Sequence, residues 1–359
     1  MAANSPVFEL LQRNEDEFVG RDLIIAGDIL DPMVFSLVKR SHSATVIVDN
    51  FVVCKKMVAM IGKSMDDSCP QIIEYKHVKL IFADVKSALT HTNEADTLLL
   101  LLSKSKQQTL KLLNTLKTKL KKEALVYTAG SNDGGAKSAD SLLKPLGFVK
   151  KVDLARKCTL FKAIYENDFN TYKGAQDIKV NPINIPLTLH QDSAVFSQGK
   201  LDKGTAMLIE CLKDLTPFGT ALDLGCGCGV VGLVLSKLGF KNVTSTDVSA
   251  AAIELAKENA KLNGCESIKV KASDMLTGLE RFDLIAVNPP FHVGVTTTTA
   301  PTVNMIIEAK DHLTKNGVMY LVANAHLGYE KVLLENFDYV QIVSSSTTFI
   351  VYKARLEEK

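Results

Sequence analysis

Short apolar runs alternate with longer segments of helical periodicity along the chain. Each run is bounded by polar or turn-forming residues, and the segment after it carries apolar positions at the spacing of one helix face. Strands and helices that alternate in this way form a mainly parallel sheet, because each helix returns the chain to the start of the next strand. In the first half the runs lie at residues 23–26, 45–48, 79–82, 97–102, 124–128 and 159–164.

The second half of the chain repeats this order. Its apolar runs lie at residues 221–224, 243–246, 268–271, 282–287, 318–323 and 349–353. An internal duplication is the most economical explanation of two such series. We therefore expect an α/β fold with two tandem Rossmann-like domains, at residues 1–167 and 187–359. Residues 168–186 are polar and show little periodicity, so we expect them to form the linker.

Length and composition agree with a two-domain protein. The chain has 359 residues, of which 46% are hydrophobic, enough for two cores. No apolar run reaches the roughly 18–20 residues of a membrane span, and the first residues lack the pattern of a signal peptide. We therefore expect a soluble cytoplasmic protein without a membrane partner. Its seven cysteines form no CxxC pair and are predicted to be reduced core thiols.

The strand expected at residues 221–224 runs into a glycine-rich turn before a helical segment. The turn has glycines at alternate positions, which bare the backbone so that a ligand can lie directly on it. Asp247 ends the next strand about 20 residues later, where a carboxylate can accept both hydroxyls of an adenosine ribose. A nucleotide-like cofactor is therefore expected; the alternative is a tight turn in an α/β core, with Asp223 as a cap.

The glycine spacing indicates which cofactor. In a dinucleotide site the third glycine follows the second by three residues, whereas here Asp223 is followed by Gly225, Gly227 and Gly229. This form resembles the S-adenosylmethionine (SAM) loop of class I methyltransferases. Ser273 and Asp274 follow the third strand, where such enzymes often place an acid for the adenine amino group; a helix cap is the equal alternative. The expected cofactor-binding residues are Asp223, Gly225, Cys226, Gly227, Gly229, Asp247, Val248, Ser273, Asp274 and Asn288.

The strand expected at residues 282–287 ends in Asn288-Pro289-Pro290-Phe291. Two prolines remove two backbone donors and restrict φ, so the carbonyls of Asn288 and Pro289 can face a pocket as acceptors. Such an edge suits an exocyclic amine, because two acceptors on its hydrogens would direct the nitrogen lone pair at the sulfonium methyl group. Phe291 would stack on the ring that carries the amine. We therefore expect Asn288, Pro289 and Phe291 to be catalytic. A strand stopped by prolines beside a core Phe is the alternative.

Most of the chain resembles the ribosomal RNA guanine-N2 methyltransferases that modify 16S RNA. The matching pieces are the glycine-rich turn, residues 288–292, 195–197 with Gly199, Leu201 and Asp202, residues 322–325, and in the first half residues 25–28 and 130–158. The resemblance implies SAM as cofactor and ribosomal RNA or an assembling ribosomal subunit as partner. It also implies a non-catalytic, degenerate methyltransferase-like first domain. The substrate-binding residues expected from it and from the motif are Phe196, Lys200, Pro290, His292 and Asn324.

The first half lacks the features that the reaction needs. After its first strand it has one glycine, Gly27, followed by Asp28, and after its fourth it has Ser103 and Lys104. A lysine-rich helix with an apolar stripe at residues 110, 113, 116 and 120 is expected next. The net charge of +2 is no nucleic-acid signature by itself. We expect the lysines to form an ordinary solvated helix face. A patch that binds RNA phosphates is the second hypothesis.

The sequence thus predicts direct methyl transfer from SAM to an exocyclic amine, with guanine N2 favoured by the resemblance. Similar tetrapeptides serve enzymes that methylate adenine N6 or a protein glutamine amide, so these substrates stay open. A dinucleotide-dependent oxidoreductase would leave residues 288–291 unexplained, and the intact glycines argue against a non-catalytic RNA-binding assembly protein. No ligand-spaced cluster predicts a metal. A monomer is favoured, although the sequence does not decide the oligomeric state.

Overall fold

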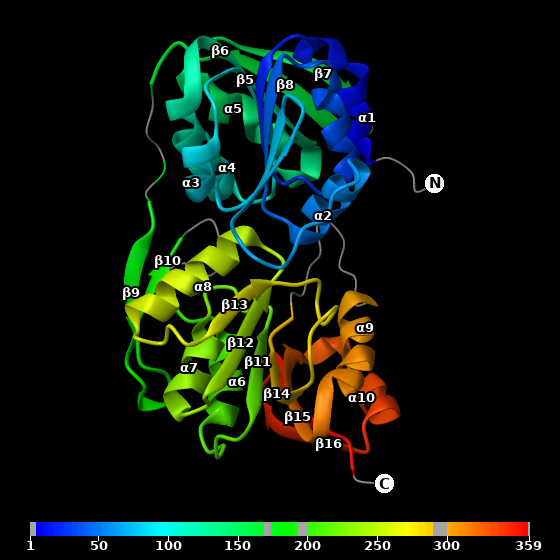
Figure 1. Ribbon diagram of the computed structural model, residues 1–359, viewed down its shortest axis with the longest axis vertical. Coiled ribbons are helices and arrows are strands. Elements are labelled where there is room, and N and C mark those ends of the chain that lie inside the picture. Colours follow the sequence, from blue (N-terminus) through cyan, green and yellow to red (C-terminus); the bar gives the residue numbers. More distant parts are fainter. Residues whose placement is uncertain (1–4, 169–171, 173, 193–199, 290–299, 358–359) are drawn as a thin grey trace. The chain divides into compact units, whose positions relative to one another are not determined.

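The computed structural model describes residues 5–168, 172, 174–192, 200–289 and 300–357. The chain divides into two compact units, which we call the N-terminal unit (Met1–Gly174) and the C-terminal unit (Ala175–Lys359). Each has a central sheet with helices on both faces (Figure 1). No helix in the described ranges is long and apolar enough to cross a membrane.

In the N-terminal unit the described residues form an eight-stranded sheet in the order β3-β4-β2-β1-β5-β6-β8-β7. The five adjacent strands β4, β2, β1, β5 and β6 are parallel, while β3, β7 and β8 pair antiparallel with their neighbours. The strands are β1 (Asp22–Gly27), β2 (Ser43–Val48), β3 (Gln71–Tyr75), β4 (Val78–Phe82), β5 (Ala95–Leu101), β6 (Leu120–Ser131), β7 (Val149–Ala155) and β8 (Cys158–Ile164).

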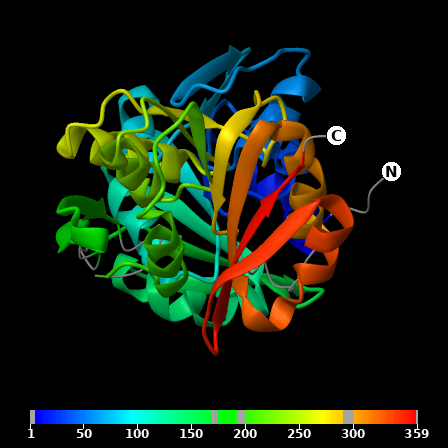
Figure 2. The ribbon, with the colours of Figure 1, turned by 90° about the horizontal axis from the view of Figure 1, so that it is seen from below.

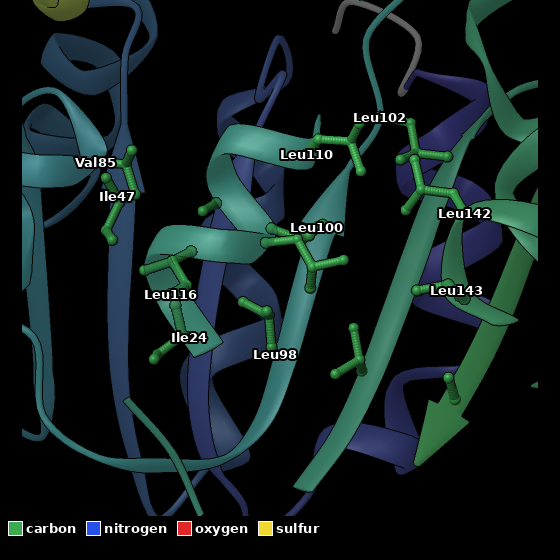
Figure 3. Packing of buried hydrophobic residues seen from close by; sticks show 14 of the residues in the cluster. Ile24, Ile47, Val85, Leu98, Leu100, Leu102, Leu110, Leu116, Leu142 and Leu143 are labelled. Atoms are coloured by element: carbon green, nitrogen blue, oxygen red, sulfur yellow. The ribbon is translucent and has the colours of Figure 1, made fainter. Parts of the chain in front are cut away.

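Two layers of helices cover this sheet. The helices are α1 (Pro6–Arg13), the 3-10 helix η2 (Pro32–Arg40), α2 (Phe51–Met60), α3 (Val85–Ala88), α4 (Lys106–Leu116) and α5 (Ala139–Leu143). Figure 1 shows α1 and α2 on one face and α3, α4 and α5 on the other. On the second face Leu110 and Leu116 of α4 pack with Ile24, Leu98 and Leu100 of the strands (Figure 3). Burial of this apolar surface is what holds helix and sheet together.

The C-terminal unit has a seven-stranded sheet among its described residues, in the order β13-β12-β11-β14-β15-β17-β16. The five adjacent strands β13, β12, β11, β14 and β15 are parallel. Strand β17 pairs antiparallel with both β15 and β16. The strands are β11 (Thr220–Leu224), β12 (Asn242–Asp247), β13 (Lys269–Ala272), β14 (Phe282–Val287), β15 (Leu313–Asn324), β16 (Tyr339–Ser345) and β17 (Phe349–Arg355).

Alternate strand residues of this sheet face two separate cores. One core contains α6 (Lys203–Leu212), α7 (Val230–Leu238) and α8 (Ala250–Leu262), and the other contains α9 (Ala300–Ala309) and α10 (Glu330–Asn336). Figure 2 shows α9 and α10 in orange on the opposite side of the sheet from the yellow-green helices. The unit is therefore a three-layer α/β domain, as the sequence predicts.

The two sheets share one topology. Without β3, the order β4-β2-β1-β5-β6-β8-β7 matches β13-β12-β11-β14-β15-β17-β16 strand for strand, with the same directions. All the strands expected from the apolar runs are present. The duplication inferred from the sequence is thus visible in the fold, and β3 is an addition at one edge of the N-terminal sheet.

The predicted C-terminal end of the lysine-rich helix is wrong. Helix α4 stops at Leu116, a short 3-10 turn covers Lys117–Lys119, and Leu120 begins β6, where it pairs with Ala95 of β5. Pairing with the sheet therefore overrides the helical spacing of the leucines. Three of the lysines also bind acids at 2.6 Å: Lys111 with Asp84, Lys117 with Asp168 and Lys121 with Asp22. Fewer of these charges are open to phosphates than the sequence alone indicates.

The segment expected to be a linker contains part of a β-hairpin. Strand β9 (Gln176–Val180) pairs antiparallel with β10 (Leu187–Gln191), and the buried side chains of Leu187 and Leu189 join the core of the C-terminal unit. The alternating pattern of β9 is too short to be recognised without its partner strand.

Two asparagines hold the free edge of β10: Asn259 of α8 and Asn263, which caps the end of that helix. Asn259 accepts a hydrogen bond from His190 N at 2.7 Å and donates to its carbonyl at 3.1 Å, and Asn263 exchanges the same two bonds with Thr188. Because both lie four residues apart on one helix, their amides imitate a neighbouring strand. Asn259 also donates to Cys228 O at 2.9 Å, which links the hairpin to the glycine-rich turn.

A buried carboxyl group joins β11 to α7. Asp223 is 3% exposed, and its Oδ2 accepts a hydrogen bond from Gly232 N at 2.8 Å. A Cβ on Gly232 would lie 2.3 Å from Ser245 Oγ, so only glycine lets α7 approach this closely. Burial raises the pKa of Asp223 to about 7; the hydrogen bond from Gly232 opposes this rise and the charge of Asp247 adds to it.

Replacing Asn259 tests the clamp on β10. Asn259→Ala leaves three backbone groups without their partner, so we expect the free energy of unfolding to fall by about 2–4 kcal/mol. Urea unfolding of the whole chain measures this loss. Glu258→Ala, an exposed neighbour on the same helix, is the control and should change the value by less than about 0.5 kcal/mol. Equal effects of the two changes would contradict the role of the clamp.

The raised pKa of Asp223 predicts a pH dependence of stability. Because the folded-state pKa of about 7 exceeds the ordinary value of 3.8, the folded protein keeps this proton while the unfolded chain loses it. The free energy of unfolding should therefore fall between about pH 4 and pH 7, by on the order of 4 kcal/mol in total, and then level off. Asp223→Asn should remove this part of the slope in urea unfolding at several pH values. The exposed Asp214→Asn should leave it, and a slope unchanged in Asp223→Asn would refute the assignment.

Candidate active site

The predicted site residues that the structure describes, Lys200 apart, lie at one edge of the C-terminal sheet. They follow the carboxyl ends of five adjacent parallel strands, which lie in the order β13, β12, β11, β14 and β15. In open α/β sheets this edge binds ligands, because the loops after the strands diverge around the point where the strand order reverses. Here that point lies between β11 and β14.

The turn after β11 exposes its backbone in the way that the sequence predicts. Gly225, Gly227 and Gly229 have φ of 71°, 53° and 83°, values that L side chains rarely adopt. A Cβ on Gly225 or Gly227 would have no neighbour within 4 Å, so the space beside them is open, whereas one on Gly229 would touch Ala256 of α8. The first two glycines thus face the candidate ligand space and the third packs against a helix.

Asp247 ties this turn to the end of β12. Its Oδ2 accepts a hydrogen bond from Gly227 N at 3.0 Å and its Oδ1 one from Ser249 N at 2.9 Å. Burial raises the pKa of Asp247, and the amides of Ser249, Gly227 and Val248 oppose the rise. A carboxylate can accept about four hydrogen bonds, so beside these amides the group keeps capacity for a ligand hydroxyl.

The end of β13 lies beside Asp247. Ser273 donates its backbone N–H to Asp247 O at 3.0 Å and its hydroxyl to Met275 O at 2.7 Å, and it is buried. Asp274 is exposed. Ser273 therefore shapes the backbone of the loop, and Asp274 has a carboxylate that reaches solvent.

The side-chain amide of Asn288, after β14, has an oriented hydrogen-bond pattern. Its Nδ2 donates to Thr205 Oγ1 at 2.8 Å and to Asp202 Oδ2 at 3.2 Å. Its Oδ1 is buried and has no hydrogen-bond partner within the described part of the chain. Pro289 follows it and is buried. A buried acceptor without a partner is a group that a hydrogen-bond donor such as an amine would satisfy.

Only some of the remaining predicted site residues lie in the described part of the chain. Phe196, Pro290, Phe291 and His292 lie outside the described residues. Lys200 is exposed, three residues before α6. Asn324 ends β15 at the same sheet edge and is partly buried, opposite Phe349 of β17. The structure thus brings the turn, Asp247, Ser273, Asn288 and Asn324 to one edge.

The sequence analysis assigned no role to three residues of this region. Asp202 and Thr205 hold the Asn288 amide, and Asn259 binds the carbonyl of Cys228. An Asp followed three residues later by Thr at the start of an apolar helical run is an N-cap signal. An asparagine among the apolar positions of a helix is unusual, because such positions are mostly buried. These signals show that the residues are structurally special, although not what they contact.

The cysteines of the turn are neutral packing groups. All seven cysteines of the chain lie in the described ranges and are free thiols. Burial raises the pKa of Cys228 to about 11 and that of Cys226 well above its ordinary value, so neither is a thiolate at neutral pH. Within the described ranges, no group of three His, Cys, Asp or Glu side chains is placed to hold a metal ion.

The corresponding edge of the N-terminal unit has no such arrangement among its described residues. A Cβ on Gly27, after β1, would lie 2.1 Å from Leu101 O, so this glycine serves close packing against β5. Asp84, at the place of Asp274, binds Lys111 at 2.6 Å. After β5 the chain continues with the buried Leu102 and with Ser103, whose hydroxyl bonds Gln108 at 2.8 Å.

Comparison with known proteins identifies the family. The family model described as methyltransferase small domain matches residues 186–353, and the model of its N-terminal domain matches residues 8–178. The chain is 32% identical to ribosomal RNA small subunit methyltransferase C of Aeromonas hydrophila subsp. hydrophila, over 98% of both chains. It is 30% identical to the protein of the same name from Aliivibrio fischeri, over 97% of this chain and 98% of that one.

A solved structure has the same fold over nearly the whole chain. The T. thermophilus 16S rRNA N2 G1207 methyltransferase, in complex with AdoMet and guanosine, superposes with a TM-score of 0.78. The match covers 98% of this chain and 92% of that one at 22% identity, which establishes the two-unit architecture. Together with the matches in sequence, the glycine-rich turn and the Asn288 edge, it shows that this chain belongs to the ribosomal RNA small subunit methyltransferase C family.

Proposed function

We propose that the C-terminal unit transfers a methyl group from SAM to the exocyclic N2 amine of a guanine in small-subunit ribosomal RNA. The observation that carries the chemistry is the Asn288 amide, whose two hydrogens are donated to Thr205 and Asp202 and whose buried oxygen has no partner among the described residues. Ribosomal RNA and the N2 position are supported by the names of the relatives and by the T. thermophilus enzyme, solved with AdoMet and guanosine.

The residues after β11 and β12 fit SAM. The open space beside Gly225 and Gly227 lets the cofactor lie on the main chain, and the free lone pairs of Asp247 suit the ribose hydroxyls. Asp223 lies in the core and joins β11 to α7 through Gly232. When bound, SAM supplies an electrophilic methyl group on a sulfonium centre.

Asn288 orients the amine. Its Oδ1 accepts one hydrogen of the exocyclic NH2, and the carbonyl of Pro289 is the proposed acceptor of the other. Two acceptors on the hydrogens turn the nitrogen lone pair toward the methyl donor. These hydrogen bonds strengthen as positive charge develops on the nitrogen, so they stabilise the transition state more than the ground state. The proton leaves to water after transfer, and no general base is needed.

A guanine in a helix cannot reach this edge with its N2 amine while it is stacked. The base must therefore be unstacked or already single-stranded in the RNA or in the assembling subunit. We propose Lys200, exposed on the chain leading to α6, and Asn324, at the end of β15, as substrate contacts together with Phe196, Pro290, Phe291 and His292. A ribosomal RNA substrate supports a cytoplasmic location for the protein.

We propose further that the N-terminal unit does not catalyse methyl transfer. Its glycine after β1 is used for packing, and its acid after β4 is neutralised by Lys111. The edge after β5 has a serine hydroxyl in place of an acceptor pair. Support of the catalytic unit and contact with RNA are the roles that remain for it.

Replacing Asn288 tests the acceptor. Asn288→Ala should lower kcat by roughly 10²–10³-fold, since it removes a hydrogen bond that is strongest in the transition state, and should leave SAM affinity within a few fold. Transfer from labelled SAM to total RNA, ribosomal subunits, DNA and protein, followed by nucleoside analysis, measures it. Asn242→Ala, an exposed asparagine of the same unit, is the matched control. N2-methylguanosine as the wild-type product is expected; label in adenine or glutamine would overturn the substrate assignment.

Replacing Asp247 tests the cofactor position. Asp247→Ala removes the acceptor of the ribose hydroxyls and frees Gly227 N, so SAM affinity should fall at least about 10-fold. Isothermal titration calorimetry with SAM measures the change. Asp214→Ala, an exposed acid of the same unit, should bind SAM like the wild type. Unchanged affinity in Asp247→Ala would place the cofactor elsewhere.

A further inference from the structure

The Asn288 amide is held from behind by residues that need not touch substrate. Thr205 lies in the first turn of α6, and Asp202 caps that helix, where its Oδ2 accepts Thr205 N at 2.9 Å. The hydroxyl of Thr205 also donates to Asp202 Oδ2, at 3.2 Å. Both residues then receive Asn288 Nδ2, at 2.8 Å from Thr205 Oγ1 and 3.2 Å from Asp202 Oδ2.

This arrangement permits only one orientation of the amide. A carboxylate accepts hydrogen bonds and cannot donate them, so the amide atom beside Asp202 must be the NH2 group. Thr205 donates its only hydroxyl hydrogen to the same carboxylate, so its oxygen accepts the hydrogen bond from the Asn288 amide. A flipped amide would bring Oδ1 against the oxygen of Asp202 and lose that bond, and it would bond Thr205 only if the hydroxyl gave up its bond to Asp202. The oxygen of Asn288 is thereby directed away from α6.

We propose that Asp202 and Thr205 are positioning residues that make Asn288 an acceptor toward the substrate amine. The inference rests on the proposed function of Asn288 and adds a reason for its selectivity. An asparagine with a free amide presents a donor or an acceptor with equal ease, whereas this one presents only its oxygen. The site therefore prefers substrates that donate from an NH2 group and disfavours those with a carbonyl at that place.

The carboxylate of Asp202 has a second effect. A charged acceptor on the amide NH2 polarises the amide and makes its oxygen a stronger acceptor. This oxygen lies where positive charge develops on the attacking nitrogen. Asp202 therefore acts on the reaction through Asn288, without contact with the base.

Thr205→Val is the primary test, because valine keeps the shape of threonine and removes the hydroxyl. We expect kcat to fall roughly 10- to 100-fold, as for a misoriented reacting group, with KM for RNA and the Kd for SAM within about twofold. Thr205→Ser, which keeps the hydroxyl, should retain activity within about threefold. Thr347→Val, exposed in the turn between β16 and β17, is the control for the same chemical change.

Coupling to Asn288 separates positioning from a general structural role. In an Asn288→Ala background, Thr205→Val should lower kcat by less than about twofold further, since the amide that it orients is gone. A full additional loss in that background would overturn the proposal, and so would a Thr205→Ser variant as inactive as Thr205→Val. Asp202→Asn should behave like Thr205→Val in this cycle, because asparagine still caps α6 while its NH2 can bond a flipped Asn288.

A measurement that does not depend on catalysis distinguishes the orientation of the Asn288 amide from the proposed methyl transfer. The side-chain NH2 resonances of Asn288 in a nitrogen-15 spectrum of the whole protein should show slow exchange with water in the wild type and faster exchange in Thr205→Val. If the wild type methylates no RNA but these resonances behave as expected, the proposed function fails and the orientation stands. Equal exchange in both proteins would overturn the orientation whatever the activity.

Discussion

The candidate site depends on the parallel pairing of β11 with β12 on one side and β14 on the other. In register, Leu224 lies opposite Thr246 and Val287, so the three strands end together. The glycine-rich turn, Asp247 and Asn288 come from separate parts of the chain and meet only because these ends coincide. Hydrogen bonds from Gly225 N and Cys226 N to Thr246 O, at 2.8 and 2.9 Å, secure the first two elements at this edge.

The two units show that one topology can be kept while the chemistry at its edge changes. Their strand orders agree strand for strand, yet the loops at the strand ends differ. In the N-terminal unit the places of a cofactor contact are taken by packing at Gly27 and by the Lys111–Asp84 ion pair. The frame is stabilised by apolar burial, which tolerates such changes, while the site needs particular polar atoms in particular directions.

Polar groups in the C-terminal unit are of two kinds. Asn259 and Asp247 have their hydrogen bonds within the protein, and they fix the turn and the β10 edge. The oxygen of Asn288 has no partner among the described residues, and burying it costs free energy in the absence of ligand. Thr205 and Asp202 keep the Asn288 amide in place, and under the proposed function a substrate amine would recover that cost on binding.

The sequence by itself determined the α/β class, the duplication, the central strands and the polar residues at their ends, because apolar periodicity and glycine or proline positions act locally. It placed the lysine-rich helix end wrongly at residues 117–122 and did not reveal the edge strands β3, β7 and β16, since pairing between distant segments decides these. The tertiary structure alone showed that Asp202 and Thr205 meet the Asn288 amide and that Asn259 holds β10. Such contacts join residues as many as 86 positions apart, and no local pattern records their geometry.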